Sequence, residues 1–118
     1  MALATAYADT AKPEQARAPL QWAAAHAEGR AYRAAALLNL ASLDIDARQF
    51  AQALQILQQS PSPDFEALFA ARRGDVYAVQ GQRELARKAY LDALHRLPPG
   101  AALRPLLQVK LDSVGGQA

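Results

Sequence analysis

The sequence predicts an all-α protein of helical hairpin repeats, an α-solenoid closed by a C-terminal capping helix. Two observations predict this class. Much of the apolar content is alanine and only 7% of the residues are aromatic, which suits closely packed helices better than a β-sandwich. In addition, the stretch from Ala67 to Gly100 has the pattern of two helices joined by a turn at Gly81.

Small and aromatic residues recur at fixed positions in this stretch. Gly74 and Ala86 are small where two antiparallel helices must approach closely, and Tyr77 and Tyr90 are expected to fill the space beside them. Three further positions complete the spacing: Ala70, Ala93 and Pro98. The pattern is that of a tetratricopeptide (TPR) repeat, which is about 34 residues long.

We predict one TPR-like domain over residues 1–114, followed by a disordered tail at 115–118. The predicted segments are repeats at about 1–28, 31–60 and 63–98, and a capping helix at about 103–114. Three units are about the minimum that such a stack needs for stability. The first repeat lacks most of its first helix, so we expect Met1 to lie inside a longer protein.

The remaining helix of the first repeat is predicted from about Lys12 to His26. Pro13 lies in its first turn, where a missing N–H is tolerated. Pro19 removes a bond to the carbonyl of residue 15 and is expected to kink the helix. We interpret Trp22 as a core residue between repeats, and the alternative is an aromatic side chain facing a ligand.

Three apolar residues of the first repeat are expected to lack cover, because most of its first helix is absent. They are Leu3, Tyr7 and Leu20. An open apolar patch of this kind favours self-association.

The second repeat is predicted from helices at about 31–46 and 50–59. Leu37, Leu40 and Ala41 give the first of these an inward face at helical spacing. The repeat is degenerate, since Asp44 stands where Tyr77 stands in the third repeat and Arg48 replaces the turn glycine.

Two further features are predicted: the residue that starts the third repeat, and the helix that closes the chain. Ser62 is expected to cap a helix that has Pro63 at its first position. The helix at 103–114 carries Leu107, Leu111 and Val114 on an apolar stripe, which fits a terminal capping helix.

Composition argues against catalysis and against several classes of ligand. With 13 basic and 11 acidic residues the net charge is +2, too even to indicate nucleic acid or an anionic membrane as a partner. There is no cysteine, and His26 and His95 lack the spacing of metal ligands. No nucleophile elbow and no phosphate loop occurs. We therefore predict no enzyme activity, no metal and no cofactor, in a soluble domain.

A protein partner is the remaining ligand class. The first helices of stacked hairpins line a concave face, to which we assign eight partner-binding residues: Leu38, Asn39, Ser42, Ile45, Leu68, Arg72, Asp75 and Val79. Asn39 and Arg72 occupy places where some TPR domains clamp a terminal carboxylate. Leu68 and Thr5 break that clamp pattern. We expect a mixed groove for a helix or extended segment; the alternative is a structural surface with the site elsewhere.

Four segments resemble a narrower family. They are RGDVYAVQGQRELARKAYLDAL at 73–94, PLLQVKLDSV at 105–114, LQW at 20–22 and RQFAQAL at 48–54. They resemble the YfgM-like ancillary subunit of the bacterial SecYEG translocon, over nearly the whole chain.

That resemblance implies a location and partners. Members of the family are inner-membrane proteins with one transmembrane helix and a periplasmic TPR-like domain. They associate with the Sec translocon and with a membrane-anchored periplasmic chaperone of the prolyl-isomerase type. This chain would then be the C-terminal part of the periplasmic domain, a non-catalytic adaptor in protein export. The alternatives are a cytoplasmic TPR scaffold or co-chaperone that binds a peptide, and an accessory domain of an enzyme.

Overall fold

The computed structural model describes residues 13–115 of the chain. The predictions on Leu3, Thr5 and Tyr7, and on most of the C-terminal tail, lie outside the described residues. Within residues 13–115 the chain is all-helical and contains no strand, which confirms the predicted fold class. No described helix has both the length and the apolar character of a membrane span.

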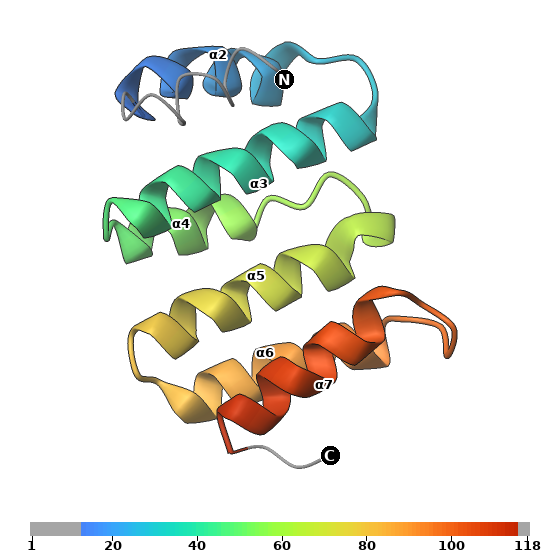
Figure 1. Ribbon diagram of the computed structural model, residues 1–118. Helices are drawn as coiled ribbons and strands as arrows, with labels where there is room; N and C mark the ends of the chain where they lie inside the picture. Colours follow the sequence, from blue (N-terminus) through green and yellow to red (C-terminus); the bar gives the residue numbers. More distant parts are fainter. Residues whose placement is uncertain (1–12, 116–118) are drawn as a thin grey trace. The chain divides into compact units, whose positions relative to one another are not determined.

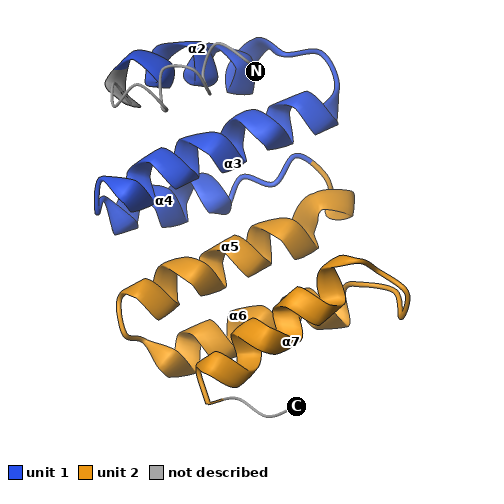
Figure 2. Cartoon of the chain, in the orientation of Figure 1, with its two compact units in different colours: residues 1–61 blue, residues 62–118 orange. Residues whose placement is uncertain are grey.

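The helices follow one another in the order expected for hairpin repeats (Figure 1). They are α2 (Pro13–His26), α3 (Arg30–Asp46), α4 (Phe50–Leu57), the short 3₁₀ helix η1 (Pro63–Phe65), α5 (Glu66–Val79), α6 (Arg83–His95) and α7 (Leu103–Ser113). The chain divides into two compact units, Met1–Pro61 and Ser62–Ala118 (Figure 2). The division falls between the second and third predicted repeats.

In the first unit, α3 packs against α2 on one side and α4 on the other. Alanines at the α2–α3 contact let the two helices approach closely, because Ala16 and Ala36 have no exposed surface. Leu20, Leu40 and Leu43 complete this core. Burial of these small and branched aliphatic residues stabilises the contact between the helices. Each Å² of apolar surface removed from water contributes about 25 cal/mol to the free energy of folding.

Two predictions on α2 were wrong. Leu20 is only 2% exposed, because it packs with Ala16 against α3, so it is not part of an open patch. Trp22 is 63% exposed and does not belong to the core. It lies two residues beyond Leu20, more than half a turn around the helix. Its ring instead stacks on His26, with ring centroids 4.7 Å apart.

In the second unit, α5 and α6 form the hairpin and α7 packs against α6. Their shared core comprises Ala70, Ala71, Ala86, Tyr90, Ala93, Leu94, Leu107 and Leu111. The predicted stripe of α7 is confirmed, since Leu107 and Leu111 have no exposed surface. Arg104 ties the two helices together by donating to the carbonyls of Leu94 at 2.8 Å and Leu97 at 3.2 Å. These bonds fix α7 against the end of α6 and the residues that follow it.

The predicted cap at Ser62 is confirmed in a modified form. Its hydroxyl accepts a hydrogen bond from the amide of Asp64 at 3.1 Å, and Pro63 occupies the first helical position. The segment that it caps is the 3₁₀ helix η1, and α5 begins directly after it at Glu66.

Both hairpins turn through the same backbone geometry. Arg48 has φ 59° and Gly81 has φ 76°, so each turn contains one residue in the left-handed region. In each turn the following amide donates back across the turn, from Gln49 to Asp44 at 2.7 Å and from Gln82 to Tyr77 at 2.9 Å. Both hairpins therefore place a residue with left-handed backbone conformation at the corresponding position of the turn.

Candidate protein-binding surface

The eight predicted partner-binding residues divide equally between α3 and α5. Within each helix the four are spaced so that they share one face. The α3 group belongs to the first compact unit and the α5 group to the second. Each group is therefore described by itself.

On α3 the predicted face offers little free hydrogen-bonding capacity. Ser42 donates its hydroxyl to the carbonyl of Leu38 at 3.0 Å, within its own helix. Leu38 and Ile45 are half-buried. Asn39 is exposed and is the polar group that a partner could reach most directly.

On α5 the predicted face combines two open apolar side chains with a cation. Leu68 is 39% exposed and Val79 is 54% exposed. Arg72 is exposed between them and makes no hydrogen bond or ion pair with another residue of 13–115. Arginine is among the residues enriched at protein-binding surfaces, and exposed apolar side chains beside it add surface that a partner can bury.

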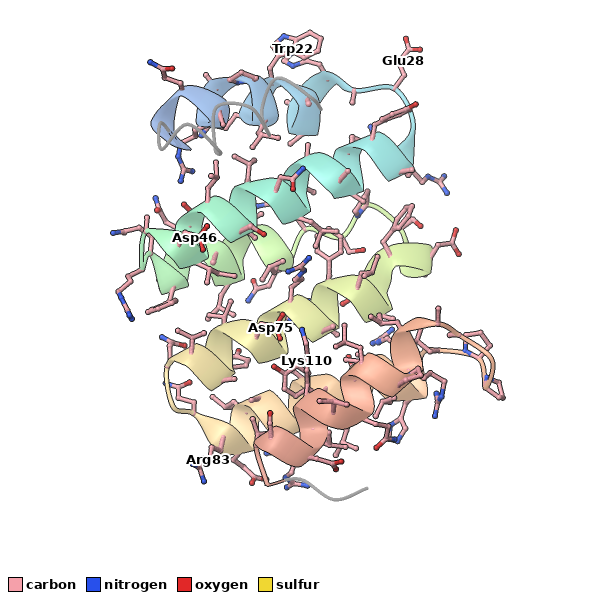
Figure 3. All side chains as sticks on the ribbon, in the orientation of Figure 1. Trp22, Glu28, Asp46, Asp75, Arg83 and Lys110 are labelled. Carbon is pink, nitrogen blue, oxygen red and sulfur yellow. The ribbon has the colours of Figure 1, made fainter. Side chains whose placement is uncertain are left out.

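Asp75, the fourth predicted residue of α5, is already engaged within its own unit. Its carboxylate accepts hydrogen bonds from Lys110 of α7, at 2.9 and 3.0 Å, and the two side chains lie together in Figure 3. It also accepts a hydrogen bond from the hydroxyl of Tyr90 at 2.7 Å. Burial, followed by the hydrogen bond to Asp75, raises the pKa of the Tyr90 phenol. Asp75 therefore positions α7 against the hairpin, and its charge is balanced before any partner arrives.

The ion pair with Lys110 brings a face of α7 beside α5 that the sequence analysis missed. Leu106 shares a face with Lys110, which lies four residues after it, and Val109 lies three residues after Leu106, about one turn along the same side of the helix. Leu106 and Val109 are 49% and 64% exposed. A signal was present in the sequence, since α7 has more apolar residues than one buried stripe needs.

We name the resulting set the α5–α7 surface. It comprises Leu68, Arg72, Asp75, Val79, Leu106, Val109 and Lys110. Four of its members are exposed aliphatic side chains, whereas isolated exposed hydrophobic residues are usual on any protein. The described residues contain no cluster of three metal-ligating side chains that could turn it into a metal site.

A model of the tetratricopeptide repeat-like domain matches residues 1–116. The chain belongs to this TPR-like family. It is also 32% identical, over 114 residues, to the ancillary SecYEG translocon subunit of Neisseria gonorrhoeae. That alignment covers 97% of this chain and 54% of the relative, so the chain spans about half of the relative's length. The match confirms the resemblance found in the sequence. No solved structure matches the chain.

The TPR-like period explains why α7 contributes to the candidate surface. Leu106 and Val109 follow Arg72 and Asp75 by one repeat period of about 34 residues. Thus α7 occupies the register of a further first helix, with no second helix after it among the described residues. Leu106 and Val109 therefore correspond in register to Arg72 and Asp75 of α5, and Lys110 beside them contacts Asp75 directly.

Proposed function

We propose that the chain is a non-catalytic protein-interaction domain of an ancillary Sec translocon subunit, and that its repeats act as one TPR-like domain. The TPR-like family and the similarity to the Neisseria subunit support an interaction role in Sec-associated protein export. The observation that carries the proposal is the α5–α7 surface, where exposed Leu68, Val79, Leu106 and Val109 accompany Arg72.

The proposed partners are translocon subunits and a periplasmic chaperone of the prolyl-isomerase type. We place the domain in the periplasm, on a single-pass inner-membrane protein whose membrane helix lies outside this sequence. The support is the resemblance of residues 73–94 and 105–114 to that family, together with the similarity to the Neisseria subunit.

A pulldown from detergent-solubilised envelope tests this function. The bait is the purified domain, beside a Leu68→Glu/Val109→Glu variant that places two charges on the α5–α7 surface. The matched control is Leu85→Glu, because Leu85 is also an exposed aliphatic residue, 43% exposed, but lies on α6. Helical circular dichroism of all three proteins verifies that they are folded.

We expect the wild type and the Leu85 variant to retain translocon or chaperone subunits, identified by mass spectrometry. The double variant should retain less than about one tenth as much, because burying two unpaired carboxylates in an interface costs more than the roughly 1.4 kcal/mol that a tenfold loss represents. Failure of the wild type to retain either subunit, or equal loss in the control, would contradict the proposal.

Self-association of the domain is a separate part of the proposal. It was predicted from an open patch at Leu3, Tyr7 and Leu20, and the structure buries Leu20. Sedimentation velocity over a range of concentrations decides it. A sedimentation coefficient that does not rise with concentration would exclude self-association without affecting the partner-binding function.

A further inference from the structure

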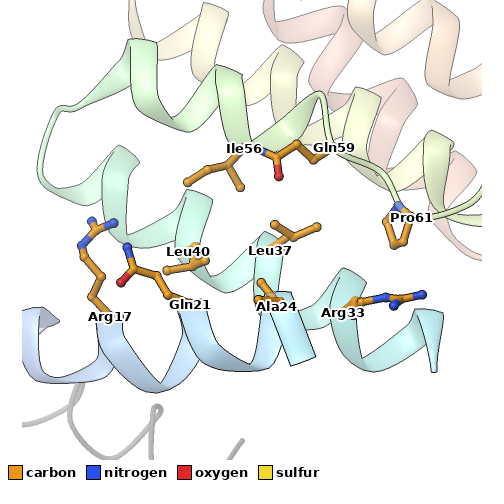
Figure 4. A pocket seen from close by; sticks show the side chains of 10 residues that line it. Arg17, Gln21, Ala24, Arg33, Leu37, Leu40, Ile56, Gln59 and Pro61 are labelled. Carbon is orange, nitrogen blue, oxygen red and sulfur yellow. The ribbon is translucent and has the colours of Figure 1, made fainter. Parts of the chain in front are cut away.

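The first compact unit contains a groove that none of the eight predicted partner-binding residues lines. It has a volume of about 410 Å³ and runs between α2, α3 and α4 (Figure 4). Its lining includes Arg17, Gln21, Arg33, Leu37, Ile56 and Gln59. The volume lies within the range of small-ligand and side-chain pockets, roughly 300–1,000 Å³.

The electrostatic character of the groove is positive. Two arginines line it, and no aspartate or glutamate is among the lining residues. Arg17 is held in place by an ion pair with Asp44 of α3, whose side chain has no exposed surface. Arg33 is half-buried, and its guanidinium makes no hydrogen bond or ion pair with any other residue of 13–115. Arg33 is therefore a cation at the edge of the groove that no described acidic side chain balances.

The floor of the groove is apolar. Leu37 is 8% exposed and Leu40 is 4% exposed, and Ile56 of α4 is half-buried beside them. The side-chain amides of Gln21 and Gln59 lie at its rim. Gln59 donates its amide hydrogen to the carbonyl of Gln55 at 3.3 Å, which leaves its own oxygen as an acceptor for a backbone N–H.

We propose that this groove binds an extended peptide segment in which an acidic side chain is flanked by aliphatic ones. The carboxylate would pair with Arg33, the aliphatic side chains would lie on Leu37, Leu40 and Ile56, and the rim amides would bond to the peptide backbone. Charge complementarity selects the acidic residue. The half-buried side chains of Ile56 and Pro61 favour a peptide over a small inorganic anion, which would leave their apolar surface in water.

Arg33 is the side chain on which the test depends. Replacing Arg17 would strand the buried carboxylate of Asp44, so loss of binding in that variant could reflect unfolding. Arg33→Gln removes a cation without stranding a partner. The matched control is Arg30→Gln, because Arg30 lies on the same helix, is exposed and does not line the groove.

The experiment is a titration of the isotopically labelled 118-residue chain, followed by methyl NMR. The probe is acetyl-Ala-Leu-Glu-Leu-Ala-amide, and its counterpart carries Gln in place of Glu. We expect the Glu peptide to shift the methyl resonances of Leu37, Leu40 and Ile56. It should bind about fivefold more tightly than the Gln peptide at low salt, as a half-exposed ion pair allows.

The variants and a competitor complete the test. Arg33→Gln should bind the two peptides with equal affinity, whereas Arg30→Gln should keep the preference. Absence of shifts at the groove methyls, equal affinity of the two peptides for the wild type, or equal effects of the two variants would overturn the proposal. Displacement of the Glu peptide by an equal concentration of inorganic phosphate would also overturn it, because the groove would then be a small-anion site. None of these outcomes bears on the α5–α7 surface, which lies on the other compact unit.

Discussion

The two hairpins α3–α4 and α5–α6 bring their two helices into close contact through different pairs of side chains. In α5–α6 the ring of Tyr90 lies directly over Gly74, where a Cβ atom would be 2.5 Å from the ring. One repeat period earlier, the corresponding residues are Ala41 and Leu57, both buried. A larger side chain on one helix is thus matched by a smaller one on the other. The summed volumes of the two pairs are therefore similar, as close packing of the interior requires.

Charge placement differs more sharply between the hairpins. Asp44 occupies the position that Tyr77 has in the second unit, and it is fully buried against Arg17 of the preceding helix α2. In the second unit the aspartate is Asp75, which is half-buried and joins α7 through Lys110. Each unit thus has a carboxylate that links the hairpin to a third helix, preceding it in one case and following it in the other.

The largest expected effect comes from breaking the buried pair of the first unit. Arg17→Met should destabilise the protein by about 3 kcal/mol, because it leaves the carboxylate of Asp44 buried without a cation. One oxygen of Asp44 already has no hydrogen-bond partner in the described residues. Arg17→Met/Asp44→Leu should recover most of the loss. Urea unfolding measures both, and a double variant no more stable than the single one would contradict this account.

The next effect tests the exchange of volumes in the second unit. Gly74→Ala should cost about 2 kcal/mol, since the new methyl group would overlap the ring of Tyr90 and outweigh the gain in helix propensity. Gly74→Ala/Tyr90→Leu recreates the residue pair of the first unit and should recover part of that loss. Thermal unfolding of the three proteins would contradict the volume argument if Gly74→Ala proved neutral.

Alkaline pH provides a third test, centred on Tyr90. The folded state raises the pKa of its phenol above the ordinary value of 10.0, so the folded protein holds this proton more tightly than the unfolded chain. Stability should therefore fall as the pH rises above about 10, by up to roughly 1.4 kcal/mol per pH unit. Tyr90→Phe should lose this contribution and show a shallower decline in urea unfolding, whereas equal slopes would contradict the assignment.

The smallest effect concerns the turns. Arg48 adopts φ 59° where the second hairpin has Gly81. A left-handed conformation costs a non-glycine residue about 1–2 kcal/mol, partly offset by the extra freedom of glycine in the unfolded chain. Arg48→Gly should therefore stabilise the protein by about 1 kcal/mol, while Arg48→Ala, which keeps the strain, should not. Differential scanning calorimetry distinguishes the two.

Local sequence signals predicted the helices well, because they depend on residues close in the chain. The turn at Gly81 and the burial of Leu107 and Leu111 were predicted correctly. Ser62 was correctly predicted to be a cap, although the segment that it caps is the 3₁₀ helix η1. Trp22 was assigned to the core on its size alone, whereas the angular position of Leu20 on α2 decides which face packs.

Features that join distant residues were not predicted. The pair of Arg17 with Asp44, the contact of Asp75 with Lys110 and the groove beside Arg33 each bring together side chains from different helices. Helical periodicity gives the face on which a charge lies, but not which helix supplies its partner. The binding role of the eight predicted residues stays a prediction. Leu106 and Val109 were not predicted, because Leu107 and Leu111 alone explained the packing of α7 as a capping helix.

The measurement that tests the account most directly is site-specific photo-crosslinking in cells. A photoreactive phenylalanine analogue is placed at Val109 of the α5–α7 surface in the full-length protein, and at Leu85 of α6 as the control, both being exposed aliphatic positions. The account predicts adducts with translocon or chaperone subunits from position 109 and none from position 85. Adducts from position 85 alone, or from neither position, would contradict the assignment of this surface as the partner-binding site.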